Sequence, residues 1–321
     1  MIFNTRKYLF LSYVLAALVM VYGSYMLPRL LPGDFVTAMY SGAHVALSVE
    51  QEAALKSEYA GTEGFGSYML DLVRLDWETS YAFDEPVSGL ILGALPWTLL
   101  LMGSAHVLSM LTGFIAGVEA AWRRGGKMEK AGVGAMTILQ GVPELAGGVI
   151  LLLVFSLHLG WFPASGAEHA YANHSSAERV ISLVHHLALP FATLFLAWFP
   201  GNFLLARGSM VMVLRQQYLE TARAKGLPPA RVRYAHGARN AMLPMVTRFG
   251  LRIAFMLTGV LVVETIYSYP GIGTLLFNAI SMRDLPLVQG IVLFSSLLVL
   301  FINLALEFIY GLLDPRVNHA S

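Results

Sequence analysis

The sequence predicts an all-α membrane protein with six transmembrane helices and both termini on the cytoplasmic side. Hydrophobic residues make up 56% of the 321 positions and charged residues only 13%, whereas charged residues are about a quarter of a typical soluble domain. Six apolar segments reach the length of about 20 residues that crosses a bilayer. The absence of cysteine excludes disulfides, thiolate metal sites and a cysteine nucleophile.

The predicted spans are these apolar segments in chain order. They lie near Tyr8–Leu27, Ile91–Ala121, Ala131–Gly160, Ile181–Ala206, Phe249–Tyr269 and Val288–Leu313. The second, third and sixth exceed the required length, so tilting or extension beyond the membrane is expected. The first follows Arg6 and Lys7 as a signal peptide would, but it has no small-x-small cleavage site, and we expect a retained anchor.

The placement of Lys and Arg predicts the orientation. One side of the membrane, with both termini and the loops after spans two and four, receives 16 of the 21 basic residues, and the positive-inside rule makes this side cytoplasmic. The loop 28–90 then faces outward with ten of the twenty acidic residues. Its stretches VEQEAALKSEYA and FGSYMLDLVR are typical of short amphipathic helices. We expect one transmembrane domain over 1–321.

The cytoplasmic loop 207–248 is unusually basic. Helix formers fill Gln216–Lys225, Gly226 suits the left-handed position after a helix end, and Leu227 can pack back on that helix. The two prolines that follow suit the first turn of a second helix, which Ala230–Met242 can supply. The sequence therefore predicts two short helices that meet at an elbow and form a docking surface. A loop that only sets topology and touches lipid headgroups is the plainer alternative.

The motif LETARAKG followed by ARNAMLP resembles the EAA loop of bacterial ATP-binding-cassette importer permeases, which docks into the ATPase subunit. Glu220, Ala222 and Gly226 match that motif, and Thr221 replaces its first alanine. The segments RLLPGD, LPWTLLL, LGWFPASG, VVETIYSYPGIGTLLFNAISMRDLPLVQG and LLDPR follow the same order as in the dipeptide/oligopeptide/nickel permease family. The chain is most similar to its B-type subunit, which has a long first outer loop.

The resemblance implies a type I importer in the bacterial inner membrane. A homologous second permease would form a heterodimer with this chain in the lipid bilayer, two ATPases would bind from the cytoplasm, and an external solute-binding protein would deliver substrate. The coupling residues would be Glu220, Thr221, Ala222, Lys225, Gly226 and Leu227. Peptides are the first expected substrate class, nickel or a metal chelate is the second, and opines or other amine-bearing solutes come third.

We expect no catalysis, bound cofactor or nucleic-acid partner for this chain. RRGGKMEK lacks the first glycine and the final Ser or Thr of a phosphate-binding loop, so ATP and Mg would belong to the partner ATPases. An intramembrane enzyme would need a nucleophile or metal constellation that the spans lack, and a stand-alone secondary transporter would tend to show repeated halves. Neither alternative explains the basic elbow.

Polar residues in the predicted spans are pathway candidates. They are Glu144, Asn202 and Glu264. A carboxylate at membrane depth is costly and usually faces the interior or a water-filled cavity. We expect Glu144, which departs from the family pattern, to line the pathway and favour positively charged substrates, with internal hydrogen bonding as the alternative. For Glu264, a structural and a gating role are both open. Arg248 and Arg252 share a helix face and are expected to snorkel to the cytoplasmic boundary, with substrate or partner contact as the alternative.

Histidines gather around the loop between spans three and four. They are His158, His169, His174, His185 and His186. Their spacing fixes no metal geometry. We therefore predict ordinary interfacial histidines, with transient metal handling as the alternative because the family that the chain resembles includes nickel transporters.

Overall fold

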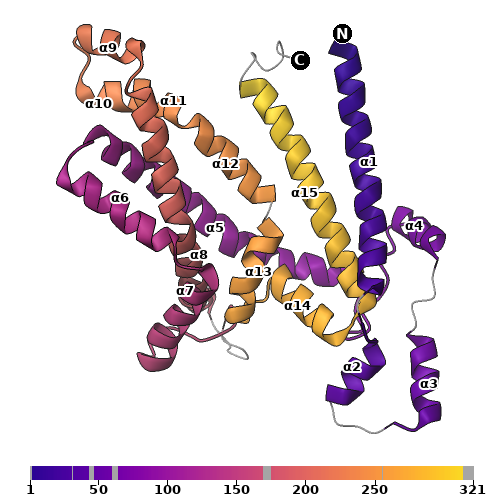
Figure 1. The fold of residues 1–321 in the computed structure, drawn as a ribbon. Coiled ribbons are helices and arrows are strands. Elements are labelled where there is room, and N and C mark those ends of the chain that lie inside the picture. The colour runs from indigo at the N-terminus through magenta and orange to yellow at the C-terminus, as the bar shows by residue number, and fades with distance from the viewer. Residues whose placement is uncertain are drawn as a thin grey trace. The chain divides into compact units, whose positions relative to one another are not determined.

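The computed structural model describes residues 2–30, 32–42, 47–59, 64–168, 175–254 and 256–313. Apart from one bridge between Thr79 and Pro86, these residues form helices, turns and irregular segments (Figure 1). The chain divides into two compact units. Unit 1 comprises Met1–Pro96 and Gly271–Ser321, and unit 2 comprises Trp97–Pro270. The all-helical prediction is confirmed for the described residues.

Unit 1 is built on two long apolar helices that pack side by side, α1 and α15 (Figure 1). Its elements are α1 (Ile2–Arg29), α2 (Phe35–Gly42), α3 (Val49–Glu58), α4 (Phe65–Val73), the start of α5 (Val87–Trp122), α14 (Ile272–Met282) and α15 (Leu285–Leu313). Val21, Tyr68 and Leu293 form a buried cluster. The hydroxyl of Ser24 lies 3.1 Å from that of Tyr68, which ties α4 to α1.

Unit 2 holds the remainder of α5 and the central helices. Its other elements are α6 (Lys127–Gln140), α7 (Glu144–Leu151), η1 (Leu152–His158), α8 (Ser176–Val213), α9 (Gln217–Ala224), α10 (Pro229–Arg231), η2 (Val232–Ala238), α11 (Arg239–Ala241), α12 (Leu243–Ala254) and α13 (Met256–Ile266). The η segments are π-helices. A buried core that includes Leu101, Leu194 and Tyr267 joins α5, α8 and the end of α13.

Four described helices are long and apolar enough to cross a membrane. They are Leu11–Arg29, Val87–Trp122, Ser176–Val213 and Leu285–Ala305. The residues of the predicted span Ala131–Gly160 form two helical segments, α6 and α7–η1, which meet at an angle of 93°, so a crossing by this part of the chain would be a bent one. Pro143 has no N–H to continue the α6 ladder and is extended, with ψ 139°. The predicted fifth span corresponds to α12 and α13. Between these two helices lies residue 255, which is outside the described part of the chain.

Glycines bring α5 and α8 into close contact in unit 2. A Cβ added to Gly113 would lie 2.8 Å from Cβ of Asn202, and one added to Gly117 would lie 2.6 Å from the Phe203 carbonyl oxygen. Small residues four positions apart allow helix backbones to approach closely in membranes. We name this contact the glycine seam.

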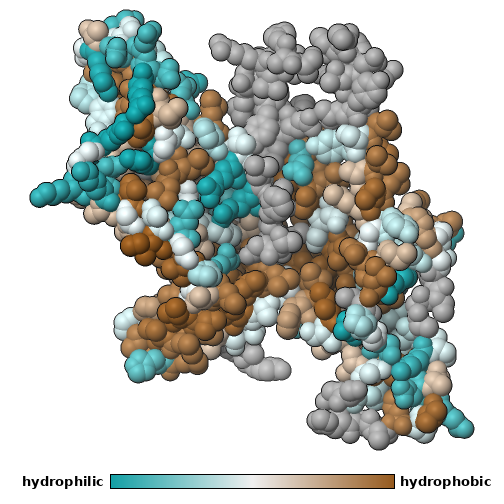
Figure 2. All heavy atoms as spheres, in the orientation of Figure 1, coloured by the Kyte–Doolittle hydropathy of each residue, from teal (hydrophilic) through white to brown (hydrophobic). Residues whose placement is uncertain are grey.

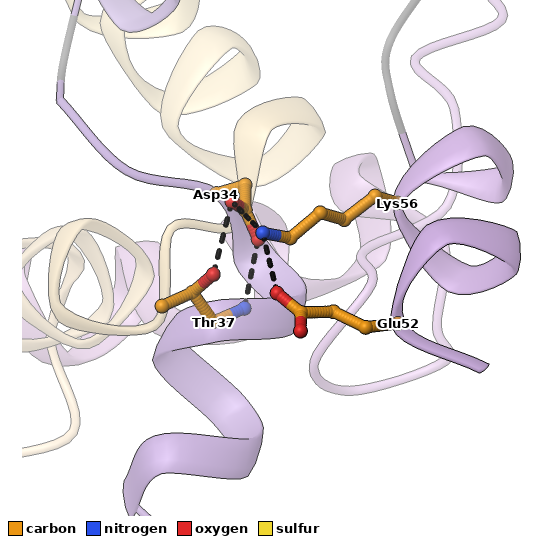
Figure 3. Close-up of polar contacts among 4 residues, drawn as sticks. All are labelled: Asp34, Thr37, Glu52 and Lys56. Atoms are coloured by element: carbon orange, nitrogen blue, oxygen red, sulfur yellow. Dashed lines mark hydrogen bonds and ion pairs between the residues drawn. The ribbon is translucent and has the colours of Figure 1, made fainter. Parts of the chain in front are cut away.

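The helices predicted within the loop 28–90 are confirmed as α3 and α4, and α2 is an additional helix. Figure 3 shows how α3 joins the start of α2: the Lys56 ammonium lies 3.3 Å from Asp34 and 2.7 Å from Glu52. Partial burial opposes the charge of Asp34, but hydrogen bonds from Thr37 and the Lys56 ammonium outweigh it and hold the pKa of Asp34 below its ordinary value. This polar bridge therefore needs an ionised Asp34.

Candidate functional site

The first arm of the basic loop is the short helix α9, which ends as the sequence predicts. Gly226 has φ +72°, and its N–H donates to the Arg223 carbonyl at 2.9 Å. The Leu227 N–H donates to the Ala222 carbonyl at 3.4 Å. These two bonds define a Schellman motif, in which a left-handed glycine satisfies the last carbonyl groups of a helix. We call residues 217–241 the elbow hairpin.

The second arm starts at Pro229, which occupies the first turn of α10. The helix predicted over Ala230–Met242 exists, but seven of its residues form the π-helix η2. In η2, Gly237 packs on α8, since a Cβ there would lie 2.6 Å from Cε of Met210. Gly237 is therefore a contact residue of the second arm.

An apolar layer holds the elbow hairpin against the ends of α5 and α8. Leu219, Ala222 and Val232 are buried together. Leu227 packs on this cluster, as predicted, and so does Trp122 at the end of α5. Burial of such side chains is favourable by about 25 cal/mol per Å², so the hairpin is a packed element and not a loose loop.

A carboxylate on α5 adds polar contacts to this packing. Glu119 accepts a hydrogen bond from Arg233 at 2.8 Å and a second one from the Tyr234 hydroxyl. The latter bond raises the pKa of Tyr234, so the phenol keeps its proton and remains a donor. The Arg223 and Arg233 guanidinium carbons lie 5.7 and 5.5 Å from the Trp122 ring, within cation–π range. The basic residues on this side of the hairpin thus fix it to α5.

The predicted coupling residues divide into an exposed group and a packed group. Glu220, Thr221, Lys225 and Gly226 are exposed. Ala222 is 6% exposed and Leu227 is half-buried, so these two hold α9 in place and do not face outward. Figure 2 shows hydrophilic residues gathered over α9 and α10, whereas hydrophobic ones cover α7 and η1.

Glu144 opens α7 directly after the bend, half-buried in unit 2. Its carboxyl is close enough to Trp198 of α8 for the indole N–H to stabilise its charge, and Arg252 of α12 acts on it electrostatically. The Arg252 guanidinium carbon lies 4.9 Å from the Trp198 ring. Arg248 donates to the Gly201 carbonyl at 3.3 Å. Both arginines therefore point into unit 2, contrary to the predicted snorkelling.

His106 of α5 completes this group and was missed from the sequence. It is 3% exposed, stacks on Phe249 at 4.5 Å and meets Trp198 edge-on at 5.7 Å. Its Nε2 lies 3.2 Å from the Phe249 carbonyl oxygen. A polar residue inside an apolar span was the available signal. We call His106, Glu144, Trp198, Arg248 and Arg252 the buried polar cluster.

The other two pathway candidates have partners inside the protein. Asn202 is 3% exposed and donates to the Ser109 hydroxyl at 3.2 Å. Glu264 is fully buried and accepts from the Thr98 hydroxyl at 2.7 Å. Both contacts are hydrogen bonds between helices of unit 2. For Glu264, such a contact corresponds to the structural role that the sequence left open beside a gating role.

The histidines bring no metal site together in the described part of the chain. His185 Nε2 lies 2.8 Å from the Trp161 carbonyl oxygen, and His186 Nδ1 lies 2.8 Å from that of Ser182. His169 and His174 lie outside the described residues. The neighbouring pair is thus engaged by backbone carbonyls.

Unit 1 has a cavity of about 330 Å³ near the C-terminal end of α1 and the start of α15. Arg29, Lys56, Arg283, Asp34 and Asp284 are among its lining residues. Asp284 is buried and accepts from the Ser80 hydroxyl at 2.5 Å and the Ala82 N–H at 2.9 Å. Arg29 donates to Gln289 at 2.5 Å. Of the charged groups at this cavity, Lys56 and Asp34 form an ion pair, while Asp284 and Arg29 have uncharged hydrogen-bond partners within the unit.

Long apolar helices with a polar cluster buried among them and an exposed basic hairpin define a helical membrane protein. Comparison with known proteins then gives the family. The chain belongs to the binding-protein-dependent transport system inner membrane components, whose family model matches residues 109–319. It is an inner membrane protein.

Relatives are similar over nearly their whole length. The oligopeptide transport system permease protein AppB of Bacillus subtilis is 34% identical over 301 residues, which cover 92% of this chain and 93% of the relative. The di/tripeptide transport system permease protein DppB of Pseudomonas aeruginosa is 35% identical, with the same shares covered. The glutathione transport system permease protein GsiC of Salmonella typhimurium is 32% identical, and 92% of each chain is covered.

Proposed function

We propose that this chain is the permease subunit of an ATP-driven importer of di- or oligopeptides. The elbow hairpin is the observation that carries the proposal. It presents a short, rigidly backed helix to an outside partner, and relatives that share this length of chain are named as peptide or glutathione permeases. These names do not favour the nickel alternative. A secondary transporter gives no reason for a packed basic hairpin of this kind.

The proposed assembly follows the type I importer plan. The chain would form one permease domain over 1–321, with six spans, both termini in the cytoplasm, an outer segment 28–90 and the coupling loop 207–248. A homologous second permease would complete the translocation pathway. Two ATPase subunits, which supply the ATP and Mg sites, would bind the hairpin side, and a solute-binding protein would deliver substrate on the other side. The distribution of Lys and Arg supports this orientation.

The proposed coupling step starts at the exposed face of α9. Glu220, Thr221 and Lys225 would contact the ATPase, while Ala222 and Leu227 transmit the motion through the apolar layer beneath. Glu119 and Arg233 link the second arm to α5. When ATP closes the ATPase dimer, the hairpin would move with α5 and α8, and the two permeases would switch between inward and outward access.

Within this plan, we place the substrate pathway beside Glu144. A carboxylate at membrane depth is a functional candidate by default, and it borders a cavity of about 180 Å³ in unit 2. Asn202 and Glu264 have internal hydrogen-bond partners, so we assign them to the pathway wall as structural supports.

The test combines copurification and transport. A tagged chain expressed with its full operon should copurify with a second permease and two ATPase subunits. Proteoliposomes that hold the complete assembly should take up a radiolabelled peptide only with ATP inside and binding protein outside. The chain reconstituted alone should take up none. Uptake by the chain alone, or purification without ATPase, would contradict the proposal.

A further inference from the structure

Three polar atoms of the buried polar cluster lie buried without a hydrogen-bond partner among the described residues. Glu144 Oε1, Arg252 Nη1 and His106 Nδ1 are buried, and none has a hydrogen-bond partner in the described part of the chain. Most buried polar side-chain atoms in native proteins have a partner. Three such atoms, from α5, α7 and α12, lie in one cluster and are able to hydrogen-bond with a polar group from outside the chain.

The chemistry of these atoms defines what the ligand must offer. Because a carbonyl oxygen only accepts, the contact of His106 Nε2 with Phe249 places the ring N–H on Nε2 and leaves Nδ1 as an acceptor. Glu144 adds a carboxylate acceptor, and Arg252 adds a donor with positive charge. A matching ligand has N–H donors, one of them cationic, and an anionic acceptor.

Trp198 explains why the acid and the base do not satisfy each other. Arg252 lies over the indole ring, and Glu144 lies within reach of the indole N–H. Trp198 is only 6% exposed and is packed in the core of unit 2, so it holds its place. No ion pair within 4 Å joins Glu144 to Arg252 in the described structure. Glu144 Oε1 and Arg252 Nη1 thus each remain able to form a hydrogen bond with a ligand.

We propose that the buried polar cluster binds a zwitterionic ligand, namely a short peptide with free termini. Glu144 binds the terminal ammonium, Arg252 binds the terminal carboxylate and His106 Nδ1 accepts a peptide N–H. Arg248 and Arg252 oppose a ligand of net positive charge, so this assignment replaces the expected preference for cations. The cavity of about 180 Å³ beside Glu144, with walls that include Ile150 and Leu196, accommodates an apolar side chain. The inference rests on the proposed peptide function.

The experiment measures uptake of trialanine, N-acetyl-trialanine and trialanine amide by the complete importer in proteoliposomes. The wild type should prefer trialanine over both blocked forms. Glu144→Gln should lower the preference over the acetylated peptide about tenfold and leave the preference over the amide unchanged. Arg252→Gln should lower the preference over the amide about tenfold and leave the preference over the acetylated peptide unchanged. Since the binding protein is the same throughout, its own selectivity cancels from each comparison between variant and wild type.

Matched controls separate local from general effects. Glu50→Gln and Arg74→Gln remove the same charges from exposed positions outside the cluster and should change neither preference. If either single variant fails to assemble because one buried charge is left uncompensated, the double variant Glu144→Gln/Arg252→Gln removes both charges and should lose both preferences.

The outcomes are distinct. Unchanged preferences in the Gln variants, or an equal loss of uptake for all three peptides, would refute zwitterion binding and leave the cluster a structural feature. A wild type that does not discriminate would refute it as well. If the wild type takes up no trialanine at all, the proposed peptide function fails, and this inference fails with it.

Discussion

The Gly226 elbow provides a test in which the magnitude follows from backbone geometry alone. Its φ of +72° lies in the left-handed region, where an L-residue costs about 1–2 kcal/mol. A Cβ added there meets nothing within 4 Å, so the cost contains no steric clash. A change of this size alters the equilibrium between the bent elbow and other conformations by about 5- to 30-fold.

A graded series converts that cost into a transport measurement. Gly226→Asn should have the smallest effect because asparagine tolerates the left-handed region, Gly226→Ala an intermediate one, and Gly226→Val the largest. The measurement is the number of ATP molecules hydrolysed per peptide imported by the complete assembly in proteoliposomes. This ratio should rise in the order Asn, Ala, Val.

Gly125 supplies the matched control. It has φ +88° and open space around its Cβ position, but it lies in the turn between α5 and α6 and outside the elbow hairpin. Gly125→Val should therefore lower stability without raising the ATP-to-peptide ratio. A wild-type ratio in Gly226→Val, or equal uncoupling by Gly125→Val, would refute the role assigned to the elbow.

Three further expectations concern topology, helix packing and pH. In this cysteine-free chain, Ser57→Cys should react with impermeant maleimide from outside the cell and Ala230→Cys only after permeabilisation; the reverse pattern would overturn the proposed orientation. Gly117→Leu forces a side chain into the glycine seam and should lower the free energy of unfolding by about 1–3 kcal/mol or more, which would be measured as a lower melting temperature in detergent. Leucine in place of a helical glycine that has open space around it should not lower the melting temperature. Since the pKa of Asp34 is lowered, its bridge to Lys56 should stabilise the outer segment above about pH 4 and be lost as pH falls through the lowered pKa. Pepsin cleavage of that segment should thus increase in acid, and Lys56→Met should flatten the change.

Local rules predicted the elbow well because its determinants are adjacent in the chain. A glycine after a run of helix formers and two prolines before the next helix specify a Schellman turn without any distant contact. Gly226 and Leu227 accordingly lie as expected. These local signals did not predict the π-helix over Val232–Ala238, in which Gly237 packs against Met210 of α8.

Hydropathy alone could not predict the bend in the third predicted span. The mean hydropathy over Ala131–Gly160 depends only on composition. It contains no information on the direction of the helix axis, so it cannot reveal the 93° bend at Pro143. The proline was visible, but prolines inside α5 and α8 interrupt neither helix. Only packing of the neighbouring helices decides which proline ends a helix.

The buried polar cluster marks the limit of sequence reasoning on the candidate site. Helical periodicity placed Arg248 and Arg252 on one face but could not say which side chains that face meets. Trp198 and His106 come from other helices, 50 or more positions away in the chain. The sequence does not determine how each of these helices is rotated about its own axis. The orphaned atoms that motivate zwitterion binding became visible only in three dimensions.

The glycine seam has a mechanical consequence for energy conversion. At Gly113 and Gly117 the backbone of α5 lies against the backbone of α8 and the Cβ atoms of Asn202 and Ala206, so α5 has no side chain at these positions that could absorb a displacement by changing its rotamer. We therefore expect a displacement of the end of α8 to be passed on to α5 directly, because the two helices are in close contact along this part of their length. A larger residue at either position would put a deformable side chain between the two helices, and in the proposed ATP-driven cycle part of the displacement would then be lost to side-chain motion.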